Sequence, residues 1–427
     1  MYPNWPESAA DLGPLPECPG PKLGPFDFQG PQSIEFLDKA GEGLHAIVFK
    51  VRILGQIYAL KVFRWLYDFQ WEGYGDFINR KNPEGLSTLY NYTEPFNAEC
   101  RAFGRLMETG CEELAVPCFG YVLLDEDHER ALMTRFNFTN WTFNGSEEES
   151  GSVEIDEQRL LYPDKNGRSP PLRCIVKAFG QNIEGWEGHV FSQKVASRLF
   201  RSIIKLQKLG IINIDFATRQ IIDGRLSDFS TAITFPHFMT NPELNPYLSS
   251  AMIKAIEMDT FAHCITDYKW FDEEIGEWNN GFGGNGNRLI AIEAFPGRRG
   301  CPRKARYNLR GSAASAERTL YTFVDPRRYG WTANQVVGGV GTQSTSRKRR
   351  SGRVSKAVAS QSARSKDPKR IWRKLTALPD RWHYQCEGED EGWLDVMNSE
   401  GIHIPDLQWA CKDGYMFPAN YDNDHIA

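Results

Sequence analysis

The stretch that most constrains the fold of this chain lies between residues 210 and 230. Phe191–Leu209 predicts a strong amphipathic helix, because apolar residues recur on one face and a glycine follows the last of them. Beyond this helix, Asp215 and Asp228 stand 13 residues apart. The Asp223-Gly224 step between them predicts a tight turn that joins two short strands. The segment therefore carries two acidic side chains on one helix–loop–hairpin unit.

This unit resembles the catalytic loop of protein kinases, followed by their metal-binding Asp-Phe-Gly motif. The resemblance places Asp215 at the position of the catalytic base and Asp228 at the position of a magnesium ligand. Gln220 stands where kinases have an asparagine that binds the second metal ion. The resemblance thus implies ATP and Mg²⁺ as cofactors.

A glycine-rich turn and a lysine-bearing strand lie earlier in the chain. Gly41 and Gly43 fall between two predicted strands, a context that excludes a dinucleotide-binding or P-loop motif, both of which need a following helix. Small residues in such a hairpin let backbone N–H groups approach nucleotide phosphates, although an ordinary glycine turn gives the same pattern. Lys61 lies in the apolar strand Gln56–Phe63 and corresponds to the kinase lysine that contacts the phosphates.

A lysine in an apolar strand needs an acidic partner, because an unpaired buried ammonium is costly. Glu99 lies on the helix predicted over Glu94–Gly110, 38 residues after Lys61, and is the expected partner. Glu94 is the rival, and a solvated charge is the alternative role for Glu99. We expect a Lys61–Glu99 salt bridge that faces the glycine turn.

Five departures from the kinase pattern put phosphotransfer in doubt. Loss of one electrostatic donor to a transition state typically lowers a rate by about 10²- to 10³-fold. Gln220 keeps a carbonyl oxygen but is one methylene longer than the usual asparagine. The other departures are Asn213 for histidine, Ile214 for arginine, Ala217 for lysine and Ser230 for glycine.

Three stretches resemble the kinase-like Fta-two subunit family of the fungal inner kinetochore, which extends over roughly residues 15 to 250. The resemblance implies a chromatin-associated complex at centromeres, a role in chromosome segregation, a nuclear location and other kinetochore or chromatin-associated proteins as partners. Related fungal kinase-like proteins without a centromere role share this domain. The stretches are residues 15–26, 36–51 with Gly-Glu-Gly-Leu-His, and 57–63 with Tyr-Ala-Leu-Lys-Val-Phe.

The predicted fold class is α+β, a two-lobed protein-kinase-like fold with a β-rich N-lobe and a mainly α-helical C-lobe. The predicted parts are a disordered Pro/Gly-rich arm (1–31), the N-lobe (32–179, with an inserted loop at about 144–171), the C-lobe (180–335), a basic disordered linker (336–374) and an acidic aromatic tail (375–427). The remaining expected elements are strands at 34–37, 46–54, 116–124, 131–136 and 172–179 and helices within 245–275.

Composition excludes several other classes of protein. The net charge of −5 gives no global reason to expect nucleic-acid binding, and no apolar run approaches the ~20 residues that span a bilayer. The nine cysteines and eight histidines show no metal-ligand spacing, so no structural zinc is expected. The exception is Arg347–Lys374, which holds twelve Lys or Arg against one acid and predicts a nuclear-import signal or a weak nucleic-acid contact, or else a solvated linker.

Two functions remain open from sequence. The first is a pseudokinase that serves as a binding scaffold in a centromere or kinetochore complex, with weak ATP binding. The alternative is an active atypical Ser/Thr protein kinase or small-molecule phosphotransferase. The retained Lys61, Asp215 and Asp228 favour the second function, whereas the substituted catalytic loop favours the first.

Overall fold

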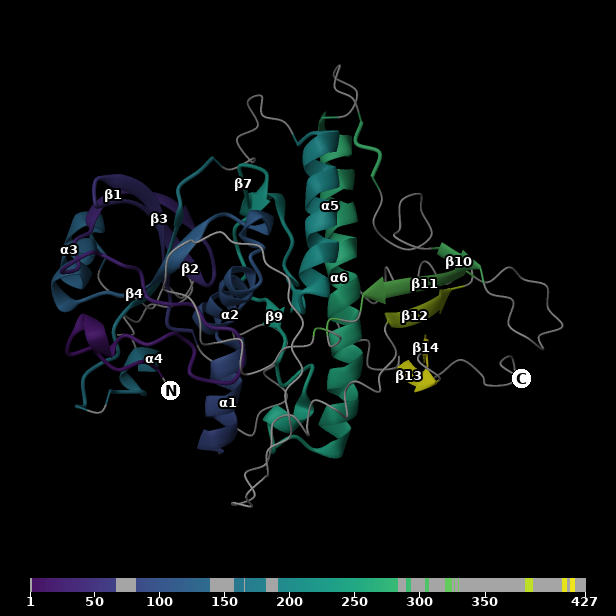
Figure 1. Ribbon diagram of the computed structural model, residues 1–427, viewed down its shortest axis with the longest axis horizontal. Helices are drawn as coiled ribbons and strands as arrows, with labels where there is room; N and C mark the ends of the chain where they lie inside the picture. The colour runs from purple at the N-terminus through teal and green to yellow at the C-terminus, as the bar shows by residue number, and fades with distance from the viewer. Residues whose placement is uncertain are drawn as a thin grey trace, which may run out of the picture.

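The computed structural model is an α+β protein, which confirms the α+β part of the predicted fold class (Figure 1). It contains two five-stranded sheets, two short two-stranded sheets and a central pair of long helices. The structure describes residues 2–66, 82–138, 157–164, 166–181, 191–282, 289–292, 304–306, 319–324, 326, 329, 381–386, 409–412 and 415–418.

The first sheet is antiparallel throughout and has the strand order β1-β2-β3-β5-β4. Strands β2 and β3 form a hairpin: Leu54 and Gly55 both have positive φ, as a tight two-residue turn between strands requires. Lys61 lies opposite Val48 on one side and Ile175 on the other, so it occupies the middle of the sheet. The strands are β1 (Glu35–Glu42), β2 (Ala46–Ile53), β3 (Gln56–Phe63), β4 (Cys118–Leu123) and β5 (Arg173–Ala178).

Helix α2 (Pro95–Glu108) packs on the first sheet, and almost all of its residues are buried. The helix predicted over Glu94–Gly110 is therefore confirmed. Proline at its first turn and the side chain of Glu94, which accepts a hydrogen bond from the Asn97 N–H at 3.2 Å, begin the helix. Gly110, with φ of 61°, follows its end in the left-handed conformation that commonly terminates helices.

The N-terminal arm is ordered, and the prediction that residues 1–31 are disordered is wrong for the described residues 2–31. Leu15 and Leu23 pair as a small bridge, and the Phe26 N–H donates to the Tyr121 carbonyl at 2.8 Å. The arm passes so close to α2 that a Cβ at Gly104 would lie 2.5 Å from the Lys22 carbonyl oxygen. Proline lowers the conformational entropy of the unfolded chain. This proline-rich segment therefore loses less entropy when it becomes ordered against the rest of the protein.

The helical part lies beside the first sheet (Figure 1). Helix α5 (Gln193–Lys208) matches the predicted one, and α6 (Ser250–Phe282) lies alongside it and fulfils the helical prediction for residues 245–275. Two small hairpin-like pairs connect these helices: β6 (Ile211–Ile212) with β9 (Ile233–Thr234), and β7 (Ile221–Ile222) with β8 (Arg225–Leu226). Asp223 and Gly224 both have positive φ, so the predicted turn between β7 and β8 is present.

Three local predictions need correction or completion. Residues 131–136, predicted as a strand, belong to helix α3 (Glu126–Phe136), because the Asp125 side chain caps an acidic first turn and starts a helix there. Helix α1 (Pro83–Thr93) was not predicted, although Asn82 and Pro83 form a helix start. Helix α4 (Glu157–Leu160) lies in the predicted inserted loop, of which residues 144–156 fall outside the described part.

A second five-stranded sheet lies on the other side of the α5–α6 pair (Figure 1). It takes strands from both sides of the predicted linker, since β11 pairs antiparallel with β12 across it. The tail therefore contributes to a sheet, while residues 336–374, including Arg347–Lys374, lie outside the described residues. The strands, in the order β10-β11-β12-β14-β13, are β10 (Lys304–Arg306), β11 (Thr319–Val324), β12 (Arg381–Cys386), β13 (Trp409–Lys412) and β14 (Tyr415–Pro418).

No helix within the described residues is long and apolar enough to cross a membrane. The same residues hold no cluster of three or more His, Cys, Asp or Glu side chains that could bind a metal ion. Six cysteines are free thiols: Cys18, Cys100, Cys111, Cys118, Cys174 and Cys264.

Candidate functional site

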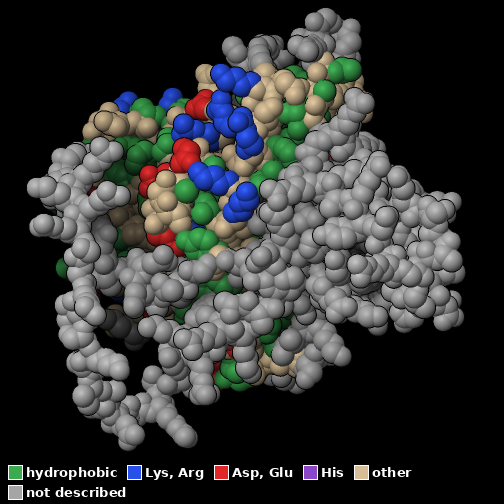
Figure 2. Space-filling view, turned by 45° about the vertical axis from the view of Figure 1, so that its right-hand side comes forward, with side chains coloured by type: hydrophobic (Ala, Val, Ile, Leu, Met, Phe, Trp, Pro, Cys, Tyr) green, Lys and Arg blue, Asp and Glu red, His purple; other side chains and the backbone are tan. Residues whose placement is uncertain are grey.

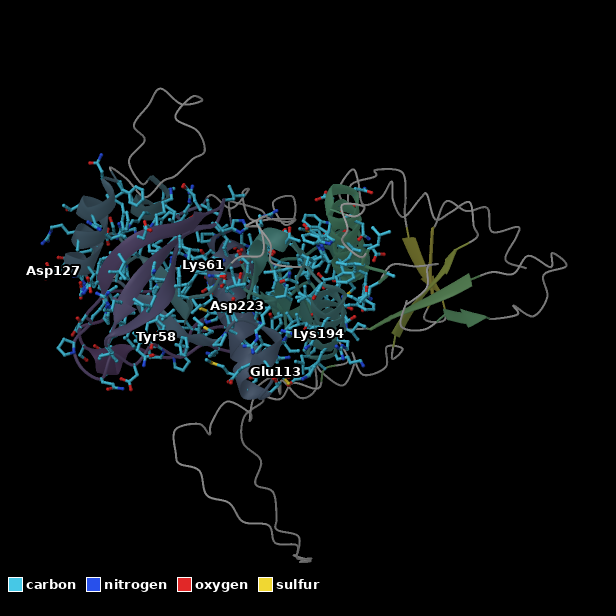
Figure 3. The ribbon with its side chains drawn as sticks, turned by 90° about the horizontal axis from the view of Figure 1, so that it is seen from above. Tyr58, Lys61, Glu113, Asp127, Lys194 and Asp223 are labelled. Carbon is cyan, nitrogen blue, oxygen red and sulfur yellow. The ribbon has the colours of Figure 1, made fainter. Side chains whose placement is uncertain are left out.

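Lys61, Glu99 and Asp228 meet in one cluster between the first sheet and the helical part, where Lys61 and Glu99 are buried and Asp228 is 28% exposed. The Lys61 Nζ lies 2.6 Å from Glu99 Oε2 and 2.6 Å from Asp228 Oδ1. The Lys61 and Glu99 side chains are only 5% and 0% exposed, so strand β3 and helix α2 remove this pair from water. The expected Lys61–Glu99 salt bridge is therefore confirmed, and Figure 3 shows Lys61 on the first sheet at this junction.

A fourth charge, which the sequence reasoning missed, closes the cluster. Lys177 on β5 donates to Glu99 Oε1 at 2.7 Å and to the Ser227 carbonyl at 2.6 Å. Glu99 thus binds one lysine with each carboxylate oxygen. Lys177 carries the same signal as Lys61, because a lysine within a buried apolar strand needs an acidic partner.

The rival carboxylate, Glu94, has a different role. It pairs with the fully buried Arg173 and caps helix α2. Burial raises the pKa of Glu94, and Arg173 only partly offsets that shift. Glu94 is therefore a structural group at the helix start, and Glu99 alone of the two faces Lys61.

Electrostatics hold the cluster in its charged form. Burial lowers the pKa of Lys61, but the Asp228 and Glu99 carboxylates raise it by more, so its pKa is raised on balance. Burial alone would raise the pKa of Asp228, yet Lys61 and Lys177 bring that pKa far below its usual range. Two cations and two anions in contact leave no net charge to be compensated at this buried position.

Asp215 lies in the loop before β7, outside the ion cluster, and is held by its own neighbours. The Gln220 amide donates to Asp215 Oδ2 at 2.5 Å, and the Arg219 guanidinium lies 3.3 Å from Oδ1. Burial raises the pKa of Asp215, Arg219 opposes that shift, and the side chain remains 20% exposed. Gln220 therefore turns its N–H₂ group to Asp215, while its Oε1 is buried without a hydrogen-bond partner among the described residues.

Asp267 on α6 fixes the start of this loop and was not foreseen from sequence. Its carboxylate accepts the backbone N–H groups of Asn213 at 3.1 Å and Ile214 at 2.7 Å. Ile214 has φ of 69°, a backbone conformation that is unusual for a β-branched residue. The two hydrogen bonds to Asp267 hold the backbone in this conformation. Burial raises the pKa of Asp267 to about 6. Asp267 lies far from this loop in the sequence, and no motif spacing connects the two, so the contact could not be predicted from the sequence.

The glycine turn lies next to the segment that follows Asp228. The Gly43 N–H donates to the Ala46 carbonyl at 2.9 Å, and a Cβ at Gly41 would meet no atom within 4 Å, so open space borders this turn. His45 Nδ1 lies 2.9 Å from Ser230 Oγ, which links the turn to the chain after Asp228. Burial lowers the pKa of His45 to about 4, so this histidine is neutral at physiological pH.

The structure joins Lys61, Glu99 and Asp228 directly, and Gly41 pairs with Val48, which in turn pairs with Lys61. Asp215 lies outside the ion cluster, and Gln220 contacts Asp215. The sequence reasoning missed Lys177, Arg219 and Asp267.

A family model for kinetochore Sim4 complex subunit FTA2 matches residues 12–233, just over half of the 427 residues. The chain belongs to this family. Membership indicates a role at the kinetochore and other kinetochore proteins as partners. No curated protein matches the chain.

The region that defines the family includes every predicted site residue, from Gly41 to Asp228. It also includes most of the ordered arm, whereas helix α6 with Asp267 and the second sheet lie beyond it. The family region is therefore a unit of arm, first sheet, α2 and the two aspartate-bearing segments.

Two buried arginines fasten α2 to the end of this region. Arg101 donates to the Thr234 carbonyl at 3.1 Å, to the Pro236 carbonyl and to the Pro19 carbonyl of the arm. Arg105 donates to the Leu209 carbonyl at 2.7 Å and to the Phe235 carbonyl. Charged donors to backbone carbonyls form strong hydrogen bonds, so α2 is tied both to the arm and to the helical part.

Proposed function

We propose that this chain is a kinase-like pseudokinase that acts as a binding scaffold in a kinetochore complex and thereby in chromosome segregation. In this proposal the first sheet with α2 and the α5–α6 part are the two lobes of a kinase-like fold. One observation carries it: Lys61 Nζ lies 2.6 Å from both Glu99 and Asp228. Lys61, which would bind phosphate, and Asp228, which would bind the metal ion, are thus paired with each other.

Weak nucleotide binding follows from the same contacts. Asp228 and the unpartnered Oε1 of Gln220 supply oxygens of the kind that Mg²⁺ prefers, and Lys61 would hold nucleotide phosphates beneath Gly41 and Gly43. Mg²⁺ would neutralise the developing charge on the phosphates. Binding must first separate Lys61 from Asp228, and the loss of this partly buried ion pair opposes the gain from the ligand.

The loop around Asp215 supports the scaffold role for a second reason. The Gln220 side chain donates a hydrogen bond to Asp215 at 2.5 Å. Gln220 stands at the kinase position for the second metal ligand, and here it binds the carboxylate at the position of the catalytic base instead of a metal ion. Ala217 offers no cation to a transferred phosphate. The Gln220 N–H₂ group thus occupies Asp215 Oδ2 in the absence of substrate.

One contact favours the alternative, an active atypical Ser/Thr protein kinase or small-molecule phosphotransferase. Arg219 brings a guanidinium to 3.3 Å from Asp215, and this cation can replace the one that Ala217 lacks. Asp215 keeps access to solvent and has a raised pKa, both of which suit a general base.

A paired measurement on wild type and Asp215→Asn separates the two functions. Asparagine keeps the acceptor for Gln220 but cannot take a proton from a hydroxyl group. We expect no transfer of γ-phosphate from ATP by either protein, and equal co-purification of both with the other subunits of the kinetochore complex. Phosphotransfer that is present in wild type and lost in the variant would establish the alternative function instead.

Nucleotide binding has its own test, because a ligand that binds the native state raises the melting temperature. We expect a small upward shift with millimolar ATP and Mg²⁺, and a smaller shift in Asp228→Asn, each measured against the same protein without nucleotide. A wild-type protein that shows no shift would reduce the proposal to a scaffold without nucleotide.

Nuclear import through Arg347–Lys374 remains a prediction from sequence. Replacing Arg347, Lys348, Arg349 and Arg350 with Ala in a fluorescent fusion should reduce nuclear accumulation if this segment is an import signal. Unchanged accumulation and unchanged salt-sensitive DNA retention would leave the linker role.

A further inference from the structure

Helix α5 presents an unbroken stripe of basic side chains. Its five Lys and Arg residues follow one another at alternating intervals of four and three, so they lie on one face of the helix. The helix contains no Asp or Glu. The stripe extends about 21 Å, from the rise of 1.5 Å per residue. It consists of Lys194, Arg198, Arg201, Lys205 and Lys208, called the α5 stripe below.

The α5 stripe is exposed and largely without acidic partners. Four of its members are exposed in the structure, and Lys205 is half-exposed. Within the part of the chain that the structure describes, only Lys205 forms an ion pair, with Glu113 at 2.6 Å. Figure 2 shows a band of Lys and Arg side chains on the face that carries α5, and Figure 3 labels Lys194 within the helical part.

Packing does not explain these residues. The apolar face of α5, with Leu199, Ile203 and Leu206, is buried against the core, and the stripe lies on the opposite side. Five like charges on one helix face repel each other and oppose helix stability slightly, by a few tenths of a kcal/mol per close pair. A stripe that costs stability and has little compensation within the fold is suited to an external anion.

The chemistry of the stripe favours a nucleic-acid backbone over an acidic protein. Protein interfaces depend on buried apolar or aromatic anchors and are depleted in lysine. Between the charges the exposed side of α5 offers mainly the small Ser197 and the half-buried Ile204. Duplex DNA presents one negative charge per about 1.7 Å of its axis and needs cations rather than apolar pockets.

We propose that the α5 stripe contacts the phosphates of duplex DNA without regard to sequence. This contact is separate from the scaffold function and from the basic segment at Arg347–Lys374. It would allow a kinetochore subunit to touch DNA while its site and its other faces bind proteins. Its affinity is electrostatic and therefore falls steeply with salt.

The test is DNA binding by the full chain, measured by fluorescence anisotropy with a labelled 30-base-pair duplex of arbitrary sequence over a series of salt concentrations. The test variant replaces Lys194, Arg198, Arg201 and Lys208 with Gln. The control variant replaces four basic residues of the first sheet and α3, Lys39, Arg52, Arg130 and Arg135, with Gln and thus removes the same charge. Circular dichroism and melting temperature establish that both variants are folded.

We expect wild type and the control to bind alike and the test variant to bind at least tenfold more weakly at low salt. The slope of log K against log salt should become shallower by about 0.9 for each phosphate that the test variant no longer neutralises. Equal binding by wild type and the test variant would overturn the proposal, as would equal decreases in affinity in both variants. A poly-glutamate peptide that binds the stripe more tightly than the duplex would assign this surface to an acidic protein instead.

Discussion

The ion cluster around Lys61 contains Asp228, and the neighbouring loop contains Asp215. The two places differ in how fully their polar groups are paired. In the cluster every charge is paired, and the burial of Lys61, Glu99 and Lys177 makes that pairing necessary. In the loop Asp215 is slightly less exposed than Asp228, at 20% against 28%, but the Gln220 and Asn213 side-chain oxygens remain without partners in the described structure. A group that is fully satisfied contributes to stability, whereas a half-satisfied one costs stability and is kept for another reason.

This contrast separates the part of the site that holds the protein together from the part that retains chemistry. The cluster joins β3, β5 and α2 to the segment of Asp228, so it connects the first sheet with the helical part. The Asp215 loop is positioned from outside the family region, by Asp267 on α6. Substitutions in the two places should therefore differ in kind.

The largest effect is expected from Glu99→Gln. The variant leaves Lys177 without a carboxylate and Lys61 with Asp228 alone, so one buried positive charge is uncompensated. Removal of one partner of a buried ion pair costs about 3–5 kcal/mol. Urea denaturation should show a loss of this size in the free energy of unfolding.

The matched control is Glu113→Gln, the same change in another lysine ion pair of 2.6 Å that is exposed to solvent. Exposed ion pairs contribute little, so its unfolding curve should nearly overlay that of wild type. Similar losses in the free energy of unfolding in both variants would mean that the ion cluster contributes no more to stability than an exposed ion pair.

Arg101→Met is expected to have the next largest effect. It leaves buried carbonyls of Thr234 and Pro236 without their donor, and each unsatisfied buried group costs about 1–3 kcal/mol. It also frees the arm from α2, because Arg101 binds the Pro19 carbonyl at 3.0 Å. The free energy of unfolding should fall, and limited proteolysis should cut the arm faster.

Gly104→Ala tests the arm by itself. Its Cβ would lie 2.5 Å from the Lys22 carbonyl oxygen, so the arm must move while the contacts to residues 234–236 remain. Faster proteolysis of the arm with a smaller loss of stability is the expected result. An arm that stays protected in both variants would contradict the view that α2 is the surface that orders it.

The anchor of the Asp215 loop should give a pH-dependent effect of intermediate size. The pKa of Asp267 is about 6 in the folded protein, above its value in an unfolded chain, so the folded state binds its proton more tightly. The contribution of Asp267 to stability is therefore full below about pH 4 and is lost as pH rises through about 6.

Asp267→Asn removes this titration. The variant should also be less stable, because the amide has only one acceptor oxygen for the N–H groups of Asn213 and Ile214. Urea denaturation at several pH values should show a difference between wild type and variant that shrinks from pH 4 to pH 7. His45 and Asp228 titrate in both proteins and cancel in this difference. A constant difference would show that Asp267 does not titrate in that range.

The sequence predicted the parts of the site that depend on local pattern. The sequence predicts the Lys61–Glu99 pair because Lys61 lies in an apolar strand and Glu99 follows it at the order and spacing of the kinase lysine–glutamate pair. The same reasoning was not extended to Lys177, and Asp267 could not be found because its contact depends on how α6 packs beside the loop. Local pattern also explains the wrong strand at residues 131–136, where the Asp125 cap outweighs the apolar alternation.

Long-range contacts account for the other differences in the fold. The arm has the composition of a disordered segment, but Gly104 and Gly120 leave room for its backbone to approach α2 and β4. The second sheet unites strands on both sides of residues 336–374, and no local pattern encodes which strands pair.

The smallest effect on stability is expected from Asp215→Asn. Burial raises the pKa of Asp215, which means that the charged form is disfavoured where it lies, and asparagine relieves this cost while still accepting a hydrogen bond from Gln220. The loss of the ion pair with Arg219 is minor, because that guanidinium is largely exposed. The free energy of unfolding should therefore change by less than about 1 kcal/mol in either direction, as is usual for substitutions outside the core. Urea denaturation beside Glu99→Gln gives the decisive comparison, since a loss as large as that of the cluster variant would make the Asp215 loop a structural element and remove the reason to assign it any chemistry.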